Sequence, residues 1–363
     1  MKLPSLKIGN LVAKIPIIQG GMGIGVSMSN LAGAVANQGG IGIISGSHPG
    51  FKEPNFRKDN RSANIAGLIK EIRNAKAISP NGIIGVNFLT ATNNYSELVT
   101  TAVKEKVDLI ISGAGIPKNL PELIKNSATK IAPIVSSGKA ASTISKLWYR
   151  NYNYLPDAII VEGPQAGGHL GFRMNHLLEN NVPALMDIVK DVLKAIQPLQ
   201  SKYNKKIPVI PAGGIFTGKD IAEMLNNGAS GVQIASRFVA TEECDAHINF
   251  KKAYINSTKD DLKLINSPVG LPGRALYNSF IEKAEQSLHK VKNCYQCLDQ
   301  CDPKTTPYCI TDALVDSVTG NAEEGLIFAG SNVHRINKMT TVKELLTELI
   351  TEAEQFFNPP AKE

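Results

Sequence analysis

The chain has 363 residues, of which 43% are hydrophobic and 20% are charged, and its formal net charge at pH 7 is +7. This composition is typical of a globular protein with a large core, and no apolar run approaches the roughly 18 residues of a transmembrane helix. Lysines and arginines are scattered instead of forming a basic block or a stripe with aromatics, so neither a nucleic acid nor a membrane is an expected partner.

Eight apolar runs rich in Val, Ile and Ala follow one another, and each ends in small or polar residues. Most begin about 25 residues apart, which suits a repeated unit of one strand and one helix. The runs are nearly continuous instead of alternating, as expected for parallel strands buried on both faces. They occupy residues 15–19, 41–44, 82–86, 107–111, 130–135, 158–161, 207–210 and 231–234.

Eight such units predict an α/β fold, a (β/α)8 TIM barrel. A doubly wound sheet is the alternative that strand counting leaves open. The glycine cluster at residues 20–25 does not favour this alternative, because it lacks the G-x-G-x-x-G spacing of a dinucleotide site. We expect residues 1–258 to form the barrel and residues 259–363 to form a C-terminal extension that packs near the barrel mouth.

Helices are expected after these strands and in the extension. Ser27 or Ser29 is placed to cap a helix that ends at Asn37. The remaining segments with helical patterns are residues 62–78, 187–199, 275–291 and 342–357.

The residues at the strand ends are the candidate functional residues, because the loops after the strands of a barrel share the face that carries the active site. They include many glycines and hydroxyls and few charges, so backbone N–H groups are the expected ligands. Such a surface suits a large flat cofactor that carries a phosphate. The positions are Gln19, Gly20, Gly21, Met22, Asn87, Ser112, Ser137, Glu162, Gly167, Gly168, Gly213, Gly214, Gln233, Ile234, Ala235 and Ser236.

The last two strands are expected to bind the phosphate, as is usual in this fold. Gly213 and Gly214 allow the backbone to approach an anion closely, and Ser236 supplies a hydroxyl. A tight strand-to-helix turn would explain the glycines alone. The pairing of both segments at this spacing favours phosphate binding.

The loop over residues 162–171 joins a buried strand to a glycine pair and one histidine. His169 has the only side chain of this loop whose ordinary pKa lies near neutrality, so it can exchange a proton at physiological pH. We therefore expect His169 to be the catalytic acid or base. His48 lies in another strand-end loop and is a weaker candidate for substrate contact.

Four cysteines lie close together in the extension, at Cys294, Cys297, Cys301 and Cys309. This density predicts a metal site, either a zinc ion held by the four thiolates or an iron–sulfur cluster. The alternative is a set of reduced thiols that pack as small apolar residues. Cys244 stands apart and is expected to be structural.

Five motifs together resemble the nitronate monooxygenase family, formerly called 2-nitropropane dioxygenase, which includes the flavin-dependent enoyl-acyl-carrier-protein reductases. The motifs occur in the family's order and the similarity covers roughly residues 10–340. They are Pro16-Ile-Ile-Gln-Gly-Gly-Met22, Gly85-Val-Asn87, Glu162-Gly-Pro-Gln-Ala-Gly-Gly-His169, Ala212-Gly-Gly-Ile215 and Gly231-Val-Gln-Ile-Ala-Ser-Arg-Phe238.

The resemblance implies a barrel that binds FMN without a covalent bond. By position, residues 20–22 and Asn87 would line the isoalloxazine, Gly167 would lie against it, and Gly214 with residues 233–236 would hold the phosphate. Glu162 stands where many members of the family have glutamine. His169 matches the catalytic histidine of the family.

Two activities follow from the resemblance. The first is an FMN-dependent nitronate monooxygenase that converts alkyl nitronates and O2 to carbonyl compounds and nitrite. The second is an enoyl-acyl-carrier-protein reductase that uses NAD(P)H as co-substrate, which the Glu162-Gly form of the loop favours. A flavin- or metal-binding module without turnover is a third reading, against which the glycine–histidine loop argues. The expected partner is a small nitronate or an enoyl thioester.

The first residues of the chain contain no apolar segment of the kind found in secretory signals, and the clustered cysteines do not resemble a secreted disulfide framework. We therefore expect a cytoplasmic protein. The sequence leaves homo-oligomerisation open.

Overall fold

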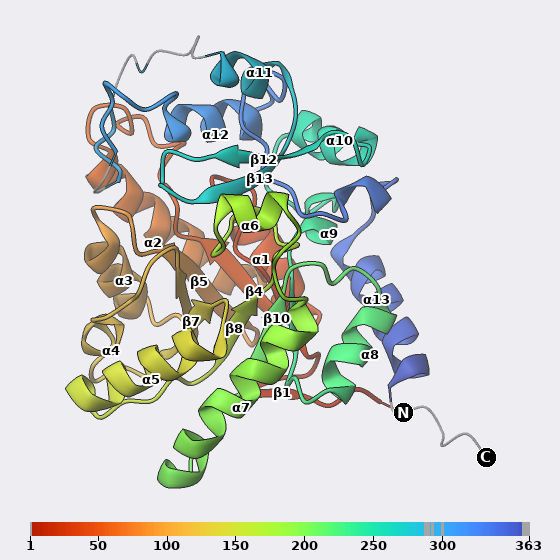
Figure 1. The fold of residues 1–363 in the computed structure, drawn as a ribbon. Coiled ribbons are helices and arrows are strands. Elements are labelled where there is room, and N and C mark those ends of the chain that lie inside the picture. Colours follow the sequence, from red (N-terminus) through yellow and green to blue (C-terminus); the bar gives the residue numbers. More distant parts are fainter. Residues whose placement is uncertain (1, 287–290, 292–293, 299–300, 358–363) are drawn as a thin grey trace.

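Eight parallel strands close into a barrel in the computed structural model, which describes residues 2–286, 291, 294–298 and 301–357 (Figure 1). The strand order around the barrel is β10-β11-β3-β4-β5-β6-β7-β8. Each barrel strand therefore lies beside the barrel strand that follows it in the chain, and β11 closes the barrel by pairing with β3. The prediction of a (β/α)8 barrel is confirmed. The strands are β3 (Ile17–Gln19), β4 (Ile41–Ser45), β5 (Ile83–Leu89), β6 (Leu109–Gly113), β7 (Lys130–Val135), β8 (Ile159–Glu162), β10 (Val209–Ala212) and β11 (Val232–Ile234).

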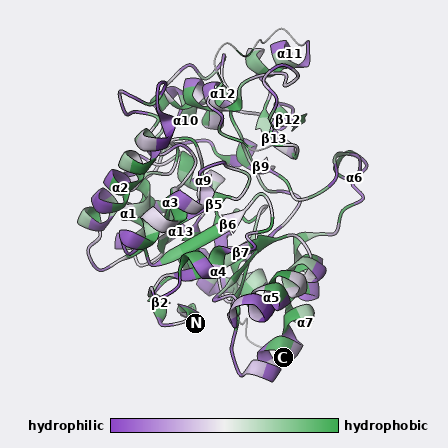
Figure 2. Ribbon diagram, turned by 90° about the vertical axis from the view of Figure 1, so that its left-hand side faces the viewer, coloured by the Kyte–Doolittle hydropathy of each residue, from purple (hydrophilic) through white to green (hydrophobic). Residues whose placement is uncertain are grey.

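The barrel interior is filled by aliphatic side chains that the strands point inward. Ile18, Ile43, Leu109 and Ile160 are fully or almost fully buried in this inner core. A short antiparallel hairpin, β1 (Leu6–Ile8) and β2 (Leu11–Ala13), adds Leu6 and other apolar side chains to it. In Figure 2 the central strands are coloured as hydrophobic, and the helices around them carry mixed colours. This pattern is expected of strands covered on both faces.

Helices form the outer ring of the barrel, and each follows a strand. They are α1 (Ser29–Asn37), α2 (Asn60–Ile78), α3 (Tyr95–Lys104), α4 (Leu120–Leu123), α5 (Gly138–Tyr152), α7 (Leu185–Tyr203) and α8 (Gly218–Asn226), with the short α9 (Ser236–Val239) after the last strand. The segment predicted as helical over residues 187–199 is the central part of α7. No helix in the described part of the chain is long and apolar enough to cross a membrane.

The last helix, α13 (Val342–Phe356), also belongs to this ring. It packs against α8 and α1, and its Leu345 and Leu349 share an apolar cluster with Ile221 and Leu31. The Glu352 carboxylate accepts a hydrogen bond from the backbone N–H of Gly218 at 2.7 Å. The last helix of the chain therefore packs on the barrel next to α9, which is too short to fill this part of the helical ring by itself.

The prediction that Ser27 or Ser29 caps α1 is wrong, because no side chain of the local sequence caps this helix. The carboxylate of Asp245 accepts hydrogen bonds from the backbone N–H groups of Met28, Asn30 and Leu31, at 2.8, 3.3 and 3.2 Å. A negative charge at a helix N-terminus satisfies unpaired donors and interacts favourably with the helix dipole. The cap comes from a residue more than 200 positions away in the chain.

Residues between α9 and α13 form a layer over the carboxyl end of the barrel (Figure 1). It contains α10 (Ile248–Asn256), β12 (Leu262–Asn266), β13 (Pro272–Leu276), α11 (Ser279–Glu285), α12 (Ile310–Val318) and the 3-10 helix η1 (Val333–Arg335). The helix predicted over residues 275–291 is wrong at its start, where β13 pairs with β12 and only α11 is helical; residues 287–290 lie outside the described residues. The boundary at residue 258 stays a prediction.

Candidate active site

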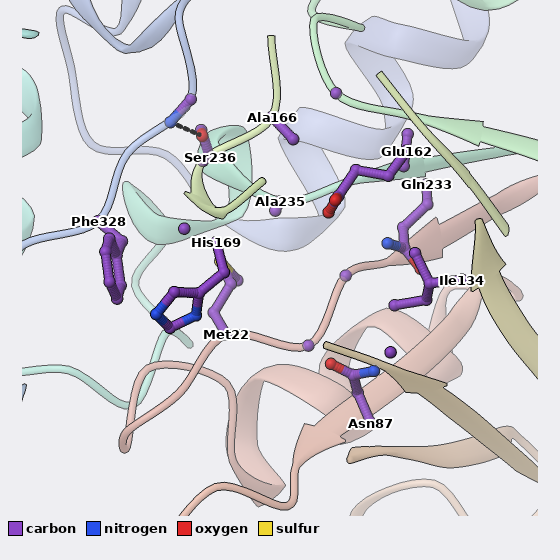
Figure 3. Close-up of a pocket in the computed structure, with 18 of the residues that line it drawn as sticks. Met22, Asn87, Ile134, Glu162, Ala166, His169, Gln233, Ala235, Ser236 and Phe328 are labelled. Carbon is purple, nitrogen blue, oxygen red and sulfur yellow. Dashed lines mark hydrogen bonds between the residues drawn. The ribbon is translucent and has the colours of Figure 1, made fainter. Parts of the chain in front are cut away.

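A cavity of about 690 Å³ opens at the carboxyl ends of the barrel strands, beneath the layer formed by the extension. Figure 3 shows residues from several strand ends around it. Most of the predicted positions line this cavity. They are Gly20, Gly21, Met22, Asn87, Ser137, Glu162, Gly167, Gly168, His169, Gly213, Gly214, Gln233, Ile234, Ala235 and Ser236.

Two predicted positions do not line the cavity. Gln19 is fully buried, and its side-chain amide accepts a hydrogen bond from Ile43 N and donates one to Ile43 O. Ser112 is also fully buried, and its hydroxyl hydrogen-bonds the hydroxyl of Tyr95 on α3 at 2.9 Å. The sequence placed both at strand ends correctly, but the pleat of each strand turns their side chains away from the mouth.

The loop that follows β8 is held in place by the extension. Gly168 and His169 form the short strand β9, which pairs with β13 in an antiparallel register. The guanidinium of Arg274 on β13 donates hydrogen bonds to the carbonyl oxygens of Pro164 and Ala166, at 2.7 and 2.6 Å. The glycine–histidine loop is therefore part of a three-stranded sheet with β12 and β13.

His169 lies between the barrel and the extension, with its ring in the cavity wall (Figure 3). Its Nε2 lies 2.7 Å from the hydroxyl of Ser267, and its ring makes an edge contact with Phe328 at 4.9 Å between centroids. Burial lowers the pKa of His169 to about 4, because the charged imidazolium is poorly solvated there. The imidazole is therefore neutral at pH 7.

Glu162 places a second titratable group in the same cavity, and its carboxylate points into the cavity in Figure 3. Burial raises the pKa of Glu162 to about 7, and the opposing effect of a hydrogen bond from the backbone of Gly171 is smaller. The other titratable side chains that line the cavity are already engaged. Arg237 pairs with Glu348, and the Tyr254 hydroxyl donates to the carbonyl of Phe328.

Replacing Glu162 by glutamine is expected to stabilise the protein without cofactor above pH 7 and to leave its stability at pH 4 unchanged. The folded-state pKa of about 7 exceeds the ordinary 4.5, so the folded state holds a proton that the unfolded state releases. Stability is therefore lost as pH rises from 4.5 through 7. The loss amounts to about 2 kcal/mol when partial contact with solvent is allowed for.

Denaturant unfolding of both proteins at pH 4, 6 and 8 measures this difference. The buried histidines titrate alike in both proteins, so their contribution cancels in the comparison. Equal free energies of unfolding at pH 8 would show that Glu162 is ionised without penalty in the folded state.

At the carboxyl ends of β10 and β11 the cavity wall is built from glycines and a serine. Gly213 and Gly214 have φ angles of +91° and +90°. Residues other than glycine adopt such backbone angles only with strain. A Cβ atom at Gly213 would lie 2.8 Å from the backbone nitrogen of Ala166. The glycines therefore allow this turn to pack closely against the loop after β8, and the phosphate site at Ser236 stays a prediction.

A segment of the extension that the sequence did not indicate completes this end. Gly330 N donates a hydrogen bond to the Ser236 hydroxyl at 3.2 Å, and the side-chain amide of Asn332 donates to Gly214 O at 2.8 Å. A Cβ atom at Gly167 would lie 2.5 Å from the backbone of Ala329. The absence of a side chain at Gly167 therefore allows this segment to pack directly against the loop after β8. The only local signal is the run of small residues after Phe328, and it follows no barrel strand.

The chemistry of the wall fits a flavin nucleotide. The side-chain oxygen of Gln233 and the hydroxyl of Ser331 are buried in the wall and have no hydrogen-bond partner among the described residues. Leaving buried polar atoms unpaired is costly, so a ligand with its own donors and acceptors is expected to satisfy them. Gln233 lies near Glu162 and Ile134 in Figure 3, and Ser331 belongs to the segment whose Gly330 contacts Ser236.

The predicted zinc or iron–sulfur site is not supported. Among the described residues, which include all four clustered cysteines, no group of three or more His, Cys, Asp or Glu side chains is placed to bind a metal ion. Cys294 is exposed, whereas Cys297 and Cys309 pack against an apolar cluster that contains Phe56 and Tyr295. The thiols of Cys297 and Cys309 therefore pack as small apolar groups, which is the alternative that the sequence left open.

His48 does not line the cavity. The side-chain amide of Asn64 lies 3.1 Å from its Nδ1, and the Thr311 hydroxyl lies 3.2 Å from its Nε2. Thr311 in turn donates a hydrogen bond to the Cys297 sulfur at 3.3 Å. His48 therefore joins a barrel loop to α12 and has a structural role.

The family model of nitronate monooxygenase matches residues 5–352. A probable nitronate monooxygenase of Bacillus subtilis is 24% identical, over 93% of this chain and 95% of that protein. A dehydrogenase of Mycobacterium tuberculosis, named for (3aS,4S,5R,7aS)-5-hydroxy-7a-methyl-1-oxo-octahydro-1H-indene-4-carboxyl-CoA, is also 24% identical, over 93% of this chain and 92% of its own.

Two solved structures share the fold over almost the whole chain. FabK from Thermotoga maritima superposes with a TM-score of 0.71 at 24% identity, over 94% of this chain and 93% of the other. Nitroalkane oxidase from Streptomyces ansochromogenes gives a TM-score of 0.71 at 20% identity, over 94% and 96%. These similarities support the barrel with its extension.

Proposed function

The chain belongs to the nitronate monooxygenase family, a family of flavin-dependent oxidoreductases, and on this premise we propose that it is an FMN-dependent nitronate monooxygenase. Its substrates would be alkyl nitronates and O2, and its products would be carbonyl compounds and nitrite. The observation that carries the proposal is that His169 and the glycine-rich phosphate end line one cavity.

The residues that line the cavity would hold the phosphate and the isoalloxazine of FMN in different parts of it. Gly213, Gly214 and Ser236 would hold the phosphate, and the segment from Gly330 to Asn332 would close over it. The part of the cavity with Gly21 and Gln233 would hold the isoalloxazine. When bound, FMN supplies the electron transfer that the side chains cannot provide.

The protein contributes a hydrogen bond to the substrate and exclusion of water. His169 reaches the cavity from β9 and is neutral at pH 7, so it can form a hydrogen bond to the substrate without bringing a charge. The Phe328 ring makes an edge contact with the imidazole, and the extension covers the mouth of the barrel. A substrate between His169 and the floor of the cavity would be held in a site of low dielectric, where each polar contact is stronger.

A second function is favoured by one relative. The similar protein of Mycobacterium tuberculosis is named for a CoA thioester. An NAD(P)H-dependent reductase of enoyl thioesters is therefore the alternative activity of the same site.

Paired assays of FMN-loaded protein separate the two functions. Oxygen uptake with ethyl nitronate, without NAD(P)H, is expected if the protein is a monooxygenase. Anaerobic oxidation of NAD(P)H that depends on an added enoyl thioester would instead assign the reductase. Protein that binds FMN and turns over neither substrate would overturn both assignments.

A further inference from the structure

The contact between His169 and Ser267 joins the catalytic loop to the extension. Ser267 directly follows β12, 98 positions from His169 in the chain, and its hydroxyl lies 2.7 Å from His169 Nε2. Only 8% of Ser267 is exposed, so water has little access to this hydroxyl. The backbone pairing of His169 with Gly273 on β13 fixes the position of the ring relative to Ser267.

The hydrogen bonds around Ser267 determine the direction of this contact. The backbone N–H of Val269 donates to the Ser267 hydroxyl oxygen at 3.3 Å. A serine hydroxyl has one proton to donate, and a buried hydroxyl needs an acceptor for it. Among the described residues, the structure gives the Ser267 hydroxyl no acceptor other than His169 Nε2.

The direction of this bond sets the tautomer of the imidazole. Burial lowers the pKa of His169 to about 4, so the ring carries one proton at pH 7. If Nε2 accepts the proton of Ser267, that ring proton is on Nδ1. No described protein group is hydrogen-bonded to Nδ1, and the ring lies in the cavity wall.

We propose that Ser267 is a positioning residue, which donates its hydroxyl proton to His169 Nε2 and so presents the Nδ1–H of His169 to the cavity. His169 then acts as a neutral hydrogen-bond donor to an oxygen that carries negative charge, and not as a base that removes a proton from carbon. This inference rests on the proposed function and narrows its substrate class. The site would take substrates that arrive as oxyanions, such as nitronates, and would not activate neutral nitroalkanes.

A neutral donor suits such a substrate for an electrostatic reason. A hydrogen bond to an anion is roughly twice as strong as one between neutral groups, and it strengthens further where water is excluded. A neutral nitroalkane would instead need a free base at Nδ1, since proton removal by a positioned base contributes about 10²- to 10⁴-fold to rate.

The nitrogen-15 NMR spectrum of histidine-labelled protein tests the tautomer without any turnover. We expect the His169 signals, assigned by comparison with His169→Gln, to show a protonated Nδ1 and an unprotonated Nε2 at pH 7. In Ser267→Ala the two tautomers should interconvert, and Ser267→Thr, which keeps a hydroxyl, should restore the wild-type pattern. A protonated Nε2 in the wild-type protein would overturn the proposal.

Kinetics of FMN-loaded protein give a second reading. We expect kcat/KM with ethyl nitronate to fall about tenfold in Ser267→Ala, to recover in Ser267→Thr, and to be unchanged in Ser127→Ala, whose hydroxyl bonds Ile124 O in another part of the barrel. Freshly dissolved neutral nitroethane should react at least about a hundredfold more slowly than its nitronate. Equal rates with both forms would overturn the donor role.

If the proposed function is wrong but the role of Ser267 is right, the experiments give a different combination of results. In that case the NMR spectra would still show the protonated Nδ1, while neither ethyl nitronate nor an enoyl thioester would be turned over.

Discussion

Replacing His169 by asparagine is expected to lower kcat/KM by about 10²- to 10⁴-fold while FMN stays bound. The imidazole is the only neutral ring nitrogen donor that the described residues place in the cavity wall. Loss of one preorganised donor to a charged oxygen costs about 10²- to 10³-fold, and loss of a group that also transfers a proton up to about 10⁴-fold. FMN should remain, because the proposed phosphate ligands, Gly213, Gly214 and Ser236, belong to the loops after β10 and β11 and not to the loop that carries His169. Flavin absorbance after gel filtration and steady-state kinetics with ethyl nitronate measure the two effects.

His176→Ala is the matched control for this experiment. His176 lies on α6 (Met174–Leu178), seven residues further along the same loop, and does not line the cavity. Its replacement should leave both measurements within about twofold of the wild-type values, an effect typical of a surface substitution. Loss of FMN from the His169 variant would assign the histidine to cofactor binding or to folding of the loop.

Replacing Gly42 by alanine is expected to reduce the free energy of unfolding by about 4 kcal/mol or more, or to prevent folding. Gly42 lies in β4, and a Cβ atom there would lie 1.9 Å from the carbonyl oxygen of Ala32 and 2.5 Å from its carbonyl carbon. Both are backbone atoms of α1, so the added methyl can be accommodated only if the helix moves off the sheet. Overpacking of this kind costs about 1–3 kcal/mol when side chains can adjust, and more when backbone must move.

The effect reaches the active site, because α1 directly follows the strand-end loop that contains Gly20, Gly21 and Met22. We expect urea unfolding to show the loss of stability and FMN titration to show weaker binding in any folded fraction. Gly270→Ala is the control for the substitution itself: its φ is +82°, but a Cβ atom there meets nothing within 4 Å. It should cost only about 1–2 kcal/mol of conformational strain. A loss at Gly42 no larger than this would mean that α1 shifts freely.

The barrel and most of its mouth could be read from the sequence because they depend on short-range chemistry. Continuous runs such as Ile41–Ser45 fix buried parallel strands, and each run ends where a small or polar residue begins. Glycines such as Gly213 and Gly214 occur where the backbone requires positive φ, so they identify the tight turn of the proposed phosphate site. The same reasoning failed for Gln19 and Ser112, because placing a residue at a strand end does not fix which way its side chain points.

The sequence by itself therefore determined the strand–helix repeat and a strand-end face that contains His169, and it favoured a barrel whose closure the structure shows. Only the tertiary structure decided what surrounds that histidine. Ser267, Arg274 and the segment from Phe328 to Asn332 reach the site from about 100 to 160 positions along the chain, and Asp245 caps α1 from more than 200. No local pattern of propensity or periodicity marks such contacts, since they form only when the extension folds back over the barrel and brings distant backbone into register with β9.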